Sequence, residues 1–289
     1  MPAGAPPRPS PSPKSRPASS PGLADPVRIL ITNDDGIAAP GIEALWRAVR
    51  DLGEVTVVAP DSERSAVGHA ITLAEPLRVS DYTGPGGLTG HAVSGTPADC
   101  VKIAVRAILA NPPDLVLSGI NQGANLGTNL LYSGTVSAAT EAAMLGLPAA
   151  AFSLADRHYH DFSAAAAYAR RLAIEIGRHG LPRGISLTVN IPPLSAGAIR
   201  GAVQTRQGRV RVLESFDKRS DPRGRHYYWM VSERMEDEAD AGSGLDDAAV
   251  AAGYISVTPI NFDLTDEAMF ANLGGWDLDP GTFSGDRHL

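Results

Sequence analysis

Short apolar runs alternate with segments of helical periodicity along most of the chain. The strand-like runs cover residues 27–32, 55–59, 114–118 and 148–153, and the helical segments cover residues 40–51, 97–110 and 135–145. The first two runs are rich in β-branched residues, and all four lack the polar alternation of a half-exposed strand. Buried strands separated by helices predict an α/β fold, with a mostly parallel sheet that carries helices on both faces.

The pattern is less regular after residue 160. We expect an Ala-rich helix over 163–180 and strands over 185–191 and 254–258. Between them, residues 206–238 contain Tyr227, Tyr228 and Trp229 among many charged residues. Aromatic and Arg residues together are typical of interfaces, whereas the alternative interpretation is an ordinary exposed hairpin.

Polar side chains follow three of the predicted strands. The first strand ends in Asn33-Asp34-Asp35-Gly36, the second leads into a loop that contains Ser65, and the third leads into a loop with Asn121 and Asn125. Ligands of open α/β sheets bind beyond the carboxyl ends of the strands. Oxygen ligands without a His or Cys cluster favour Mg²⁺ or Mn²⁺ over zinc. The sequence therefore predicts a site for one divalent ion at this edge.

Each of these groups has a simpler interpretation. Adjacent aspartates after a strand are often a helix N-cap and a solvated neighbour. Ser65 is of a type that commonly forms turns, and Asn121 and Asn125 are of a type that adopts left-handed turn conformations. The metal site is nevertheless the favoured interpretation, because the predicted fold brings all three strand ends together.

Composition narrows the possible partners. A formal net charge of -7 argues against binding to a nucleic acid duplex or to an anionic membrane surface. No run of about 18 apolar residues occurs, so no membrane span is expected. The single cysteine, Cys100, excludes an internal disulfide and suits a reducing cytoplasm, where we expect the protein to reside.

Several long motifs resemble the SurE family of survival-protein phosphatases. They are ILITNDDGIAAPGI, VVAPDSERSAVGHAITL, SGTPADCVKIA and PDLVLSGINQGANLGTNLLYSGT, followed later by SLTVNIP, TRQGR and GYISVTPINFDLT. The resemblance implies a metal-dependent hydrolase of nucleoside 5′- and 3′-monophosphates, with a Rossmann-like domain and a C-terminal region that forms homodimers or homotetramers. It also implies a loop that can cover the active site.

The resemblance divides the chain into three parts. Residues 1–26, rich in Pro and Ser, are expected to be a disordered extension. Residues 27–190 form the expected Rossmann-like catalytic domain. Residues 191–289 form the expected smaller region, with strands, a loop and oligomer contacts.

The same motifs imply the roles of individual residues. The metal ligands are Asp34, Asp35, Ser65 and Asn121, and Asp34 is our hypothesis for the group that accepts a proton from the attacking water. The candidates for phosphate binding, at the predicted start of a helix and in the loop before it, are Asn125, Ser133, Gly134 and Thr135. A simple Ser/Thr N-cap explains the last three equally well, and Asn125 is alternatively a turn residue.

The main alternative is a regulatory module that binds a nucleotide or phosphate without turnover. The chain contains no G-x-x-x-x-G-K-[ST] phosphate loop and no G-x-S-x-G nucleophile motif. A binding module would use the same loops but would not require two acids that coordinate an ion. An assay of phosphate release therefore distinguishes the regulatory module from the enzyme.

Overall fold

The computed structural model describes residues 26–208, 211–236 and 244–278. The predicted N-terminal extension lies outside these residues except for Pro26, and so does the end of the C-terminal region. In the described part, no helix is long and apolar enough to cross a membrane.

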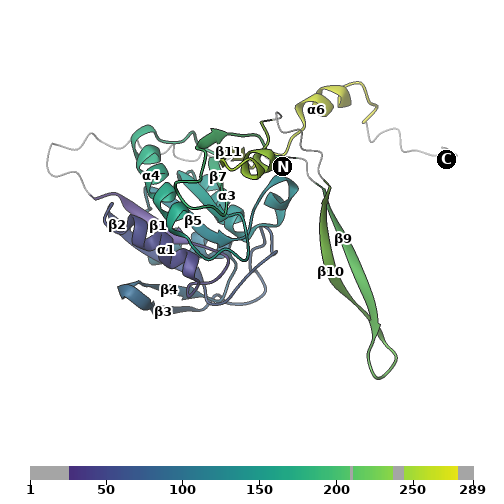
Figure 1. Ribbon diagram of the computed structural model, residues 1–289, viewed down its shortest axis with the longest axis horizontal. Helices are drawn as coiled ribbons and strands as arrows, with labels where there is room; N and C mark the ends of the chain where they lie inside the picture. The colour runs from purple at the N-terminus through teal and green to yellow at the C-terminus, as the bar shows by residue number, and fades with distance from the viewer. Residues whose placement is uncertain (1–25, 209–210, 237–243, 279–289) are drawn as a thin grey trace, which may run out of the picture.

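A nine-stranded sheet with the order β3-β4-β2-β1-β5-β6-β7-β11-β8 forms the centre of the protein (Figure 1). The pairs from β4 to β7 are all parallel, whereas β3 and β11 run antiparallel to their neighbours β4 and β7. The strands are β1 Arg28–Thr32, β2 Glu54–Pro60, β3 Val79–Thr83, β4 Thr89–Val93, β5 Leu115–Gln122, β6 Ala149–Leu154, β7 Ile185–Ile191, β8 Ala202–Gln204 and β11 Ile255–Asn261.

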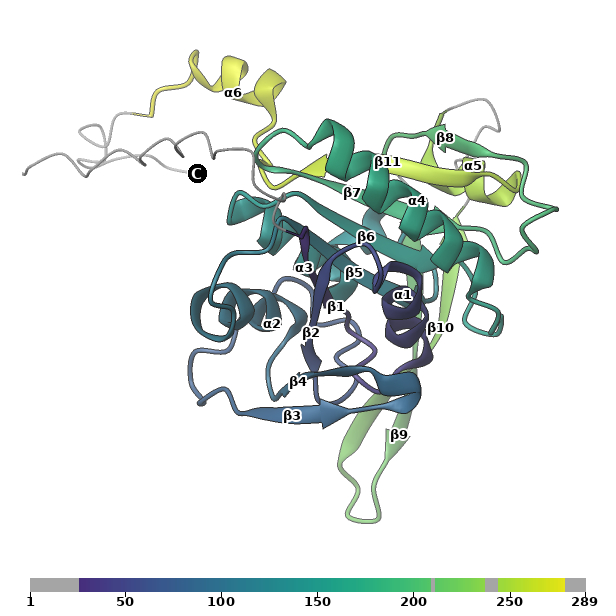
Figure 2. The ribbon, with the colours of Figure 1, turned by 90° about the vertical axis from the view of Figure 1, so that its left-hand side faces the viewer.

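Helices cover both faces of the sheet (Figure 2). Successive side chains of β1 point to opposite faces, so that Ile29 and Ile31 pack with α1 and α4, whereas Leu30 packs with α2 and α3. The helices are α1 Pro40–Val49, α2 Pro97–Ile103, α3 Gly134–Met144, α4 Ser163–His179, α5 Asp246–Ala251 and α6 Glu267–Leu273. The predicted α/β fold, with a mostly parallel sheet and helices on both faces, is confirmed.

Two details differ from the expectation. The predicted helix over 97–110 is α-helical only to Ile103, after which residues 104–108 form a wider π-turn closed by Leu109 N–H donating to Ala104 O at 2.9 Å. Strands β3, β4 and β8 and helices α5 and α6 were not predicted; β3 was missed because it is polar and mostly exposed at the edge of the sheet.

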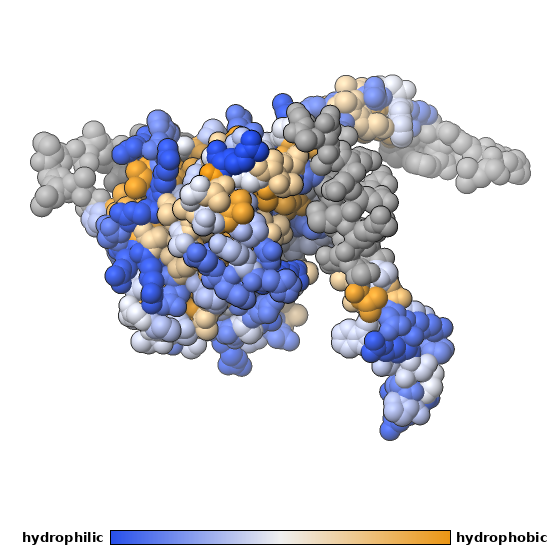
Figure 3. All heavy atoms as spheres, viewed as in Figure 1, coloured by the Kyte–Doolittle hydropathy of each residue, from blue (hydrophilic) through white to orange (hydrophobic). Residues whose placement is uncertain are grey.

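The region after residue 191 is divided between the main sheet and a separate hairpin. Strands β8 and β11 extend the sheet beyond β7. Strands β9 Arg211–Ser220 and β10 His226–Glu236 form a two-stranded antiparallel hairpin that projects from the body (Figure 1). Hydrophilic residues cover much of its visible face (Figure 3), although Phe216, Trp229 and Met230 are exposed. The region thus contains the hairpin of the alternative interpretation, and its expected roles in oligomer contacts and in covering the site stay predictions.

Close packing of α1 on the sheet gives a testable prediction. A Cβ atom on Gly41 would overlap the backbone oxygen of Ile120 in β5, whereas a Cβ on Gly177 in α4 would meet no atom within 4 Å. We expect Gly41→Ala to destabilise the protein by about 1–3 kcal/mol through overpacking. Gly177→Ala should stabilise it by about 0.5–1 kcal/mol, because alanine loses less backbone entropy in a helix. Urea denaturation of both variants measures the difference, and equal stabilities would show that α1 can move away from β5.

Candidate functional site

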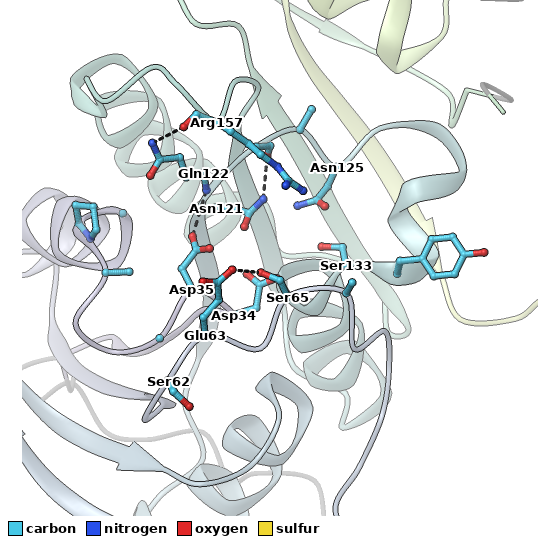
Figure 4. Close-up of a pocket in the computed structure, with 18 of the residues that line it drawn as sticks. Asp34, Asp35, Ser62, Glu63, Ser65, Asn121, Gln122, Asn125, Ser133 and Arg157 are labelled. Atoms are coloured by element: carbon cyan, nitrogen blue, oxygen red, sulfur yellow. Dashed lines mark hydrogen bonds between the residues drawn. The ribbon is translucent and has the colours of Figure 1, made fainter. Parts of the chain in front are cut away.

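A cavity of about 820 Å³ opens at the carboxyl ends of β1, β2 and β5 (Figure 4). All four candidate metal ligands line it, together with two of the four candidate phosphate-binding residues. Its polar lining includes Asp34, Asp35, Asp61, Glu63, Ser65, Asn121, Gln122, Asn125, Ser133 and Arg157. The fold thus brings together the three strand ends that the sequence marked.

Asp34 lies directly beyond β1 and is only 5% exposed. The Thr135 hydroxyl donates a hydrogen bond to its Oδ1. Helix α3 approaches so closely that a Cβ on Gly134 would lie 2.7 Å from the Asp34 Cβ. Burial raises the pKa of Asp34, and the Thr135 hydroxyl and the backbone amides of Thr135 and Gly134 oppose this only in part.

Asp35 is less buried than Asp34, and its pKa is raised as well. Burial and then the negative charge of Asp34 raise its pKa to about 6. The backbone N–H of Gln122 donates to Asp35 Oδ2 at 3.2 Å and favours the ionised form. In the unfolded chain both acids ionise near the ordinary pKa of Asp, which lies below their raised pKa values in the fold. As the pH rises from the ordinary value through the raised ones, the metal-free fold therefore loses stability.

Ser65 reaches the cavity from the loop after β2. Its hydroxyl donates to Glu63 Oε1 at 2.6 Å, which leaves its oxygen lone pairs available to a ligand. Two contacts hold the loop in place: Arg64 N–H donates to Asp34 O at 2.7 Å, and His69 Nε2 lies 2.9 Å from Glu141 Oε2 of α3. The loop that carries Ser65 is therefore tied to both β1 and α3.

Asn121 belongs to β5, whose pairing with β6 is irregular between Ser118 and Asn121. Its Nδ2 donates to Gly123 O at 2.8 Å. This bond fixes the orientation of the amide, because it engages the nitrogen end and leaves Oδ1 as the free acceptor. Asn121 can therefore present a neutral oxygen to an ion.

These four residues fit a hard divalent cation. Neither Asp34 nor Asp35 forms an ion pair with a Lys, Arg or His among the described residues, and the charge of Arg157 lowers the pKa of Asp35 only as its smallest contribution. A bound cation would supply the missing positive charge. The same part of the chain contains no group of three or more His, Cys, Asp or Glu residues suited to a metal. A site here therefore depends on the neutral oxygens of Ser65 and Asn121, a donor set that suits Mg²⁺ or Mn²⁺.

The candidate phosphate-binding residues divide into two pairs. Asn125 and Ser133 line the cavity. Asn125 is held by Asn190 and by a bond from its Nδ2 to Ser153 Oγ at 2.9 Å, and Ser133 Oγ caps α3 by accepting from Val136 N–H at 3.1 Å. Gly134 and Thr135 lie behind the lining, and Thr135 is fully buried with its hydroxyl on Asp34.

Among the polar residues that line this cavity, the sequence analysis missed Asp61, Glu63, Gln122 and Arg157. Glu63 accepts from Ser65, Gln122 donates to Asp35, and Arg157 is the one basic side chain among the described lining residues. Arg157 follows β6, the fourth of the strands that the sequence predicted. The rule that directed attention to three strand ends would have found it at the fourth.

Comparisons with known proteins confirm the resemblance. The family model "Survival protein SurE" matches residues 29–214. A 5′-nucleotidase SurE from Syntrophobacter fumaroxidans is 51% identical over 252 residues, which cover 87% of this chain and 100% of the relative. A 5′-nucleotidase SurE from Heliobacterium modesticaldum is 51% identical over 252 residues, covering 86% and 92%. The crystal structure of the SurE protein from Aquifex aeolicus has a TM-score of 0.74 and 42% identity, covering 85% of this chain and 98% of that one. This chain belongs to the SurE family.

Proposed function

We propose that this protein is a 5′-nucleotidase, a phosphomonoesterase that requires one divalent ion, Mg²⁺ or Mn²⁺. Its substrates would be nucleoside 5′-monophosphates and also 3′-monophosphates, which it converts to nucleoside and phosphate. The observation that carries the proposal is the convergence of Asp34, Asp35, Ser65 and Asn121 on one cavity. Relatives that are 51% identical to this chain are named 5′-nucleotidases, which supports nucleoside monophosphates as the substrate class.

The ion would be held by the two carboxylates and by the neutral oxygens of Ser65 and Asn121. When bound, such an ion polarises a phosphoryl oxygen and increases the acidity of water. Asp34 would accept the proton of the attacking water. Thr135 engages one oxygen of this carboxylate, so the geometry favours the other oxygen for that role.

The remaining lining residues would bind the phosphate. Ser133 and Asn125 are held in place by α3 and by Ser153, so their polar groups enter the cavity in fixed positions. Thr135 would act through Asp34 as a positioning residue, and Gly134 would provide the space for the close approach of α3 to Asp34. We further propose a homodimer or homotetramer in the cytoplasm.

The alternative function, a regulator that binds nucleotide or phosphate without turnover, would use the same cavity. It would not require the ion, so an assay of phosphate release with and without a chelator distinguishes the two functions.

Metal dependence is the first test of the proposed function. We expect phosphate release from AMP to fall by about 100-fold or more in EDTA, since the ion stabilises charge in the transition state. Added Mg²⁺ or Mn²⁺ should restore it. Binding of AMP without phosphate release under every condition would support the regulatory alternative.

A matched pair of serines provides the control. Ser65→Ala should weaken binding of the ion and raise the concentration of Mn²⁺ needed for activity. Ser62→Ala should not, because the Ser62 hydroxyl bonds to Asp61 at 2.9 Å and points away from the two carboxylates (Figure 4).

Asp35→Asn should have opposite effects on stability and activity. Removing one of two adjacent, partly buried charges should raise the Tm of the EDTA-treated protein, by about 2–4 °C for each kcal/mol of repulsion removed. The same variant should lose the rise in Tm that Mn²⁺ gives the wild type, and should lose phosphatase activity. Thermal denaturation with EDTA and with Mn²⁺ measures both effects. A variant that Mn²⁺ still stabilises as strongly as the wild type would contradict the ligand role of Asp35.

Thr135→Val tests the positioning of Asp34. The substitution keeps the shape of the side chain but removes the hydroxyl that donates to Asp34. Loss of a bond that orients a metal ligand typically lowers metal affinity or activity by about 10–100-fold. We expect kcat to fall within this range and the Mn²⁺ requirement to rise, with recovery in Thr135→Ser. Equal activity in all three proteins would show that the bond has no role in the reaction.

A further inference from the structure

The charges that line the cavity are unequal. Four carboxyl groups, those of Asp34, Asp35, Asp61 and Glu63, face one basic side chain, Arg157, among the described lining residues. Asp61 is already paired with Arg64 at 3.4 Å, but a nucleotide phosphate carries up to two negative charges, and one divalent ion does not balance the other three acids together with the substrate. Any direct cationic contact from the described lining to the phosphate therefore has to come from Arg157.

Arg157 is anchored through its backbone to the acidic side of the cavity. Gln122 donates from its side-chain Nε2 to Arg157 O at 2.9 Å, and from its backbone N–H to Asp35 Oδ2 at 3.2 Å. One residue thus links the loop after β6 to the carboxylate pair. The Arg157 stem passes over Gly123, where an added Cβ would lie 3.2 Å from Arg157 Cγ.

The guanidinium is available for a ligand. It forms no ion pair with any acid of the described residues. In Figure 4 it extends from its loop over the cavity on the side of Asn121 and Asn125. The planar guanidinium fork matches two phosphate oxygens, which makes Arg better suited than Lys to this contact.

We propose that Arg157 binds the phosphoryl oxygens of the substrate, across the cavity from Asp34 and Asp35. The proposal rests on the proposed phosphatase function, to which it adds a substrate-binding residue. Placed there, the guanidinium stabilises the phosphoryl charge in the transition state as well as in the bound substrate.

The experiment compares the wild type with Arg157→Ala, Arg157→Lys and His158→Ala. His158 is exposed in the same loop and does not line the cavity, so its variant controls for disturbance of the loop. The substrates are AMP and p-nitrophenyl phosphate, and inorganic phosphate is the inhibitor. We expect Arg157→Ala to lower kcat/KM by about 100-fold on both substrates and to raise the inhibition constant of phosphate. Arg157→Lys should recover part of the loss, and His158→Ala should behave as the wild type.

Other outcomes separate the two proposals. A loss in Arg157→Ala that is confined to AMP would place the guanidinium on the nucleoside and overturn the proposal. Unchanged kinetics in Arg157→Ala would also overturn it while leaving the proposed phosphatase intact. Absence of phosphate release in the wild type would instead refute the proposed function. The rise in Tm with Mn²⁺ should be the same in Arg157→Ala and the wild type, which shows that the variant is folded and that its ion site is unchanged.

Discussion

Two adjacent carboxylates at the end of a buried central strand impose the main electrostatic constraint on this structure. Asp34 and Asp35 both have raised pKa values, because burial disfavours the charged form of each and the charge of Asp34 adds to this effect at Asp35. The fold offsets this penalty with neutral donors: the Thr135 hydroxyl, the amides at the start of α3, and the Gln122 N–H. Neutral hydrogen bonds compensate such charges only in part. The metal-free fold therefore retains an electrostatic strain that a divalent ion would relieve, which links its stability to the ligand.

Meeting this constraint requires backbone to approach backbone closely. On one face of the sheet, Gly41 lets α1 approach the backbone of β5, and on the other, Gly134 lets the first turn of α3 approach Asp34. A larger residue at Gly134 would displace the Thr135 hydroxyl and the helix amides from the carboxylate. Gly134 is thus part of the electrostatic arrangement, since it leaves the space through which the donors of α3 reach Asp34.

The elements that the sequence predicted are those with strong packing signals. Strands β1, β2, β5 and β6 are apolar runs buried on both faces, so their pattern was sufficient to place Asp34, Ser65 and Asn121 at one edge. Strand β3 was missed because a polar edge strand shows no such pattern. Glu63 is a single charged residue in a loop, where no periodicity distinguishes a lining residue from a solvated one, whereas Arg157 was missed because the end of the fourth predicted strand was not considered. Thr135 was expected to face the cavity, but the direction of its side chain depends on how α3 packs against Asp34, which local sequence does not encode.

The distribution of charge across the cavity also bears on how its ligands interact. Asp34, Asp35 and Glu63 lie close together, and Arg157 reaches over the cavity on the side of Asn121 and Asn125 (Figure 4), near enough for its charge to lower the pKa of Asp35. Gln122 is bonded to both Asp35 and Arg157. In the proposed enzyme, the uncompensated carboxylates repel a phosphate until the ion is bound, because like charges at such range interact strongly in a partly buried site. The bound phosphate in turn adds negative charge next to the ion. Each ligand therefore raises the affinity of the other by the same factor, as linkage requires, and the constraint set by Asp34 and Asp35 extends from the fold to the binding of substrate.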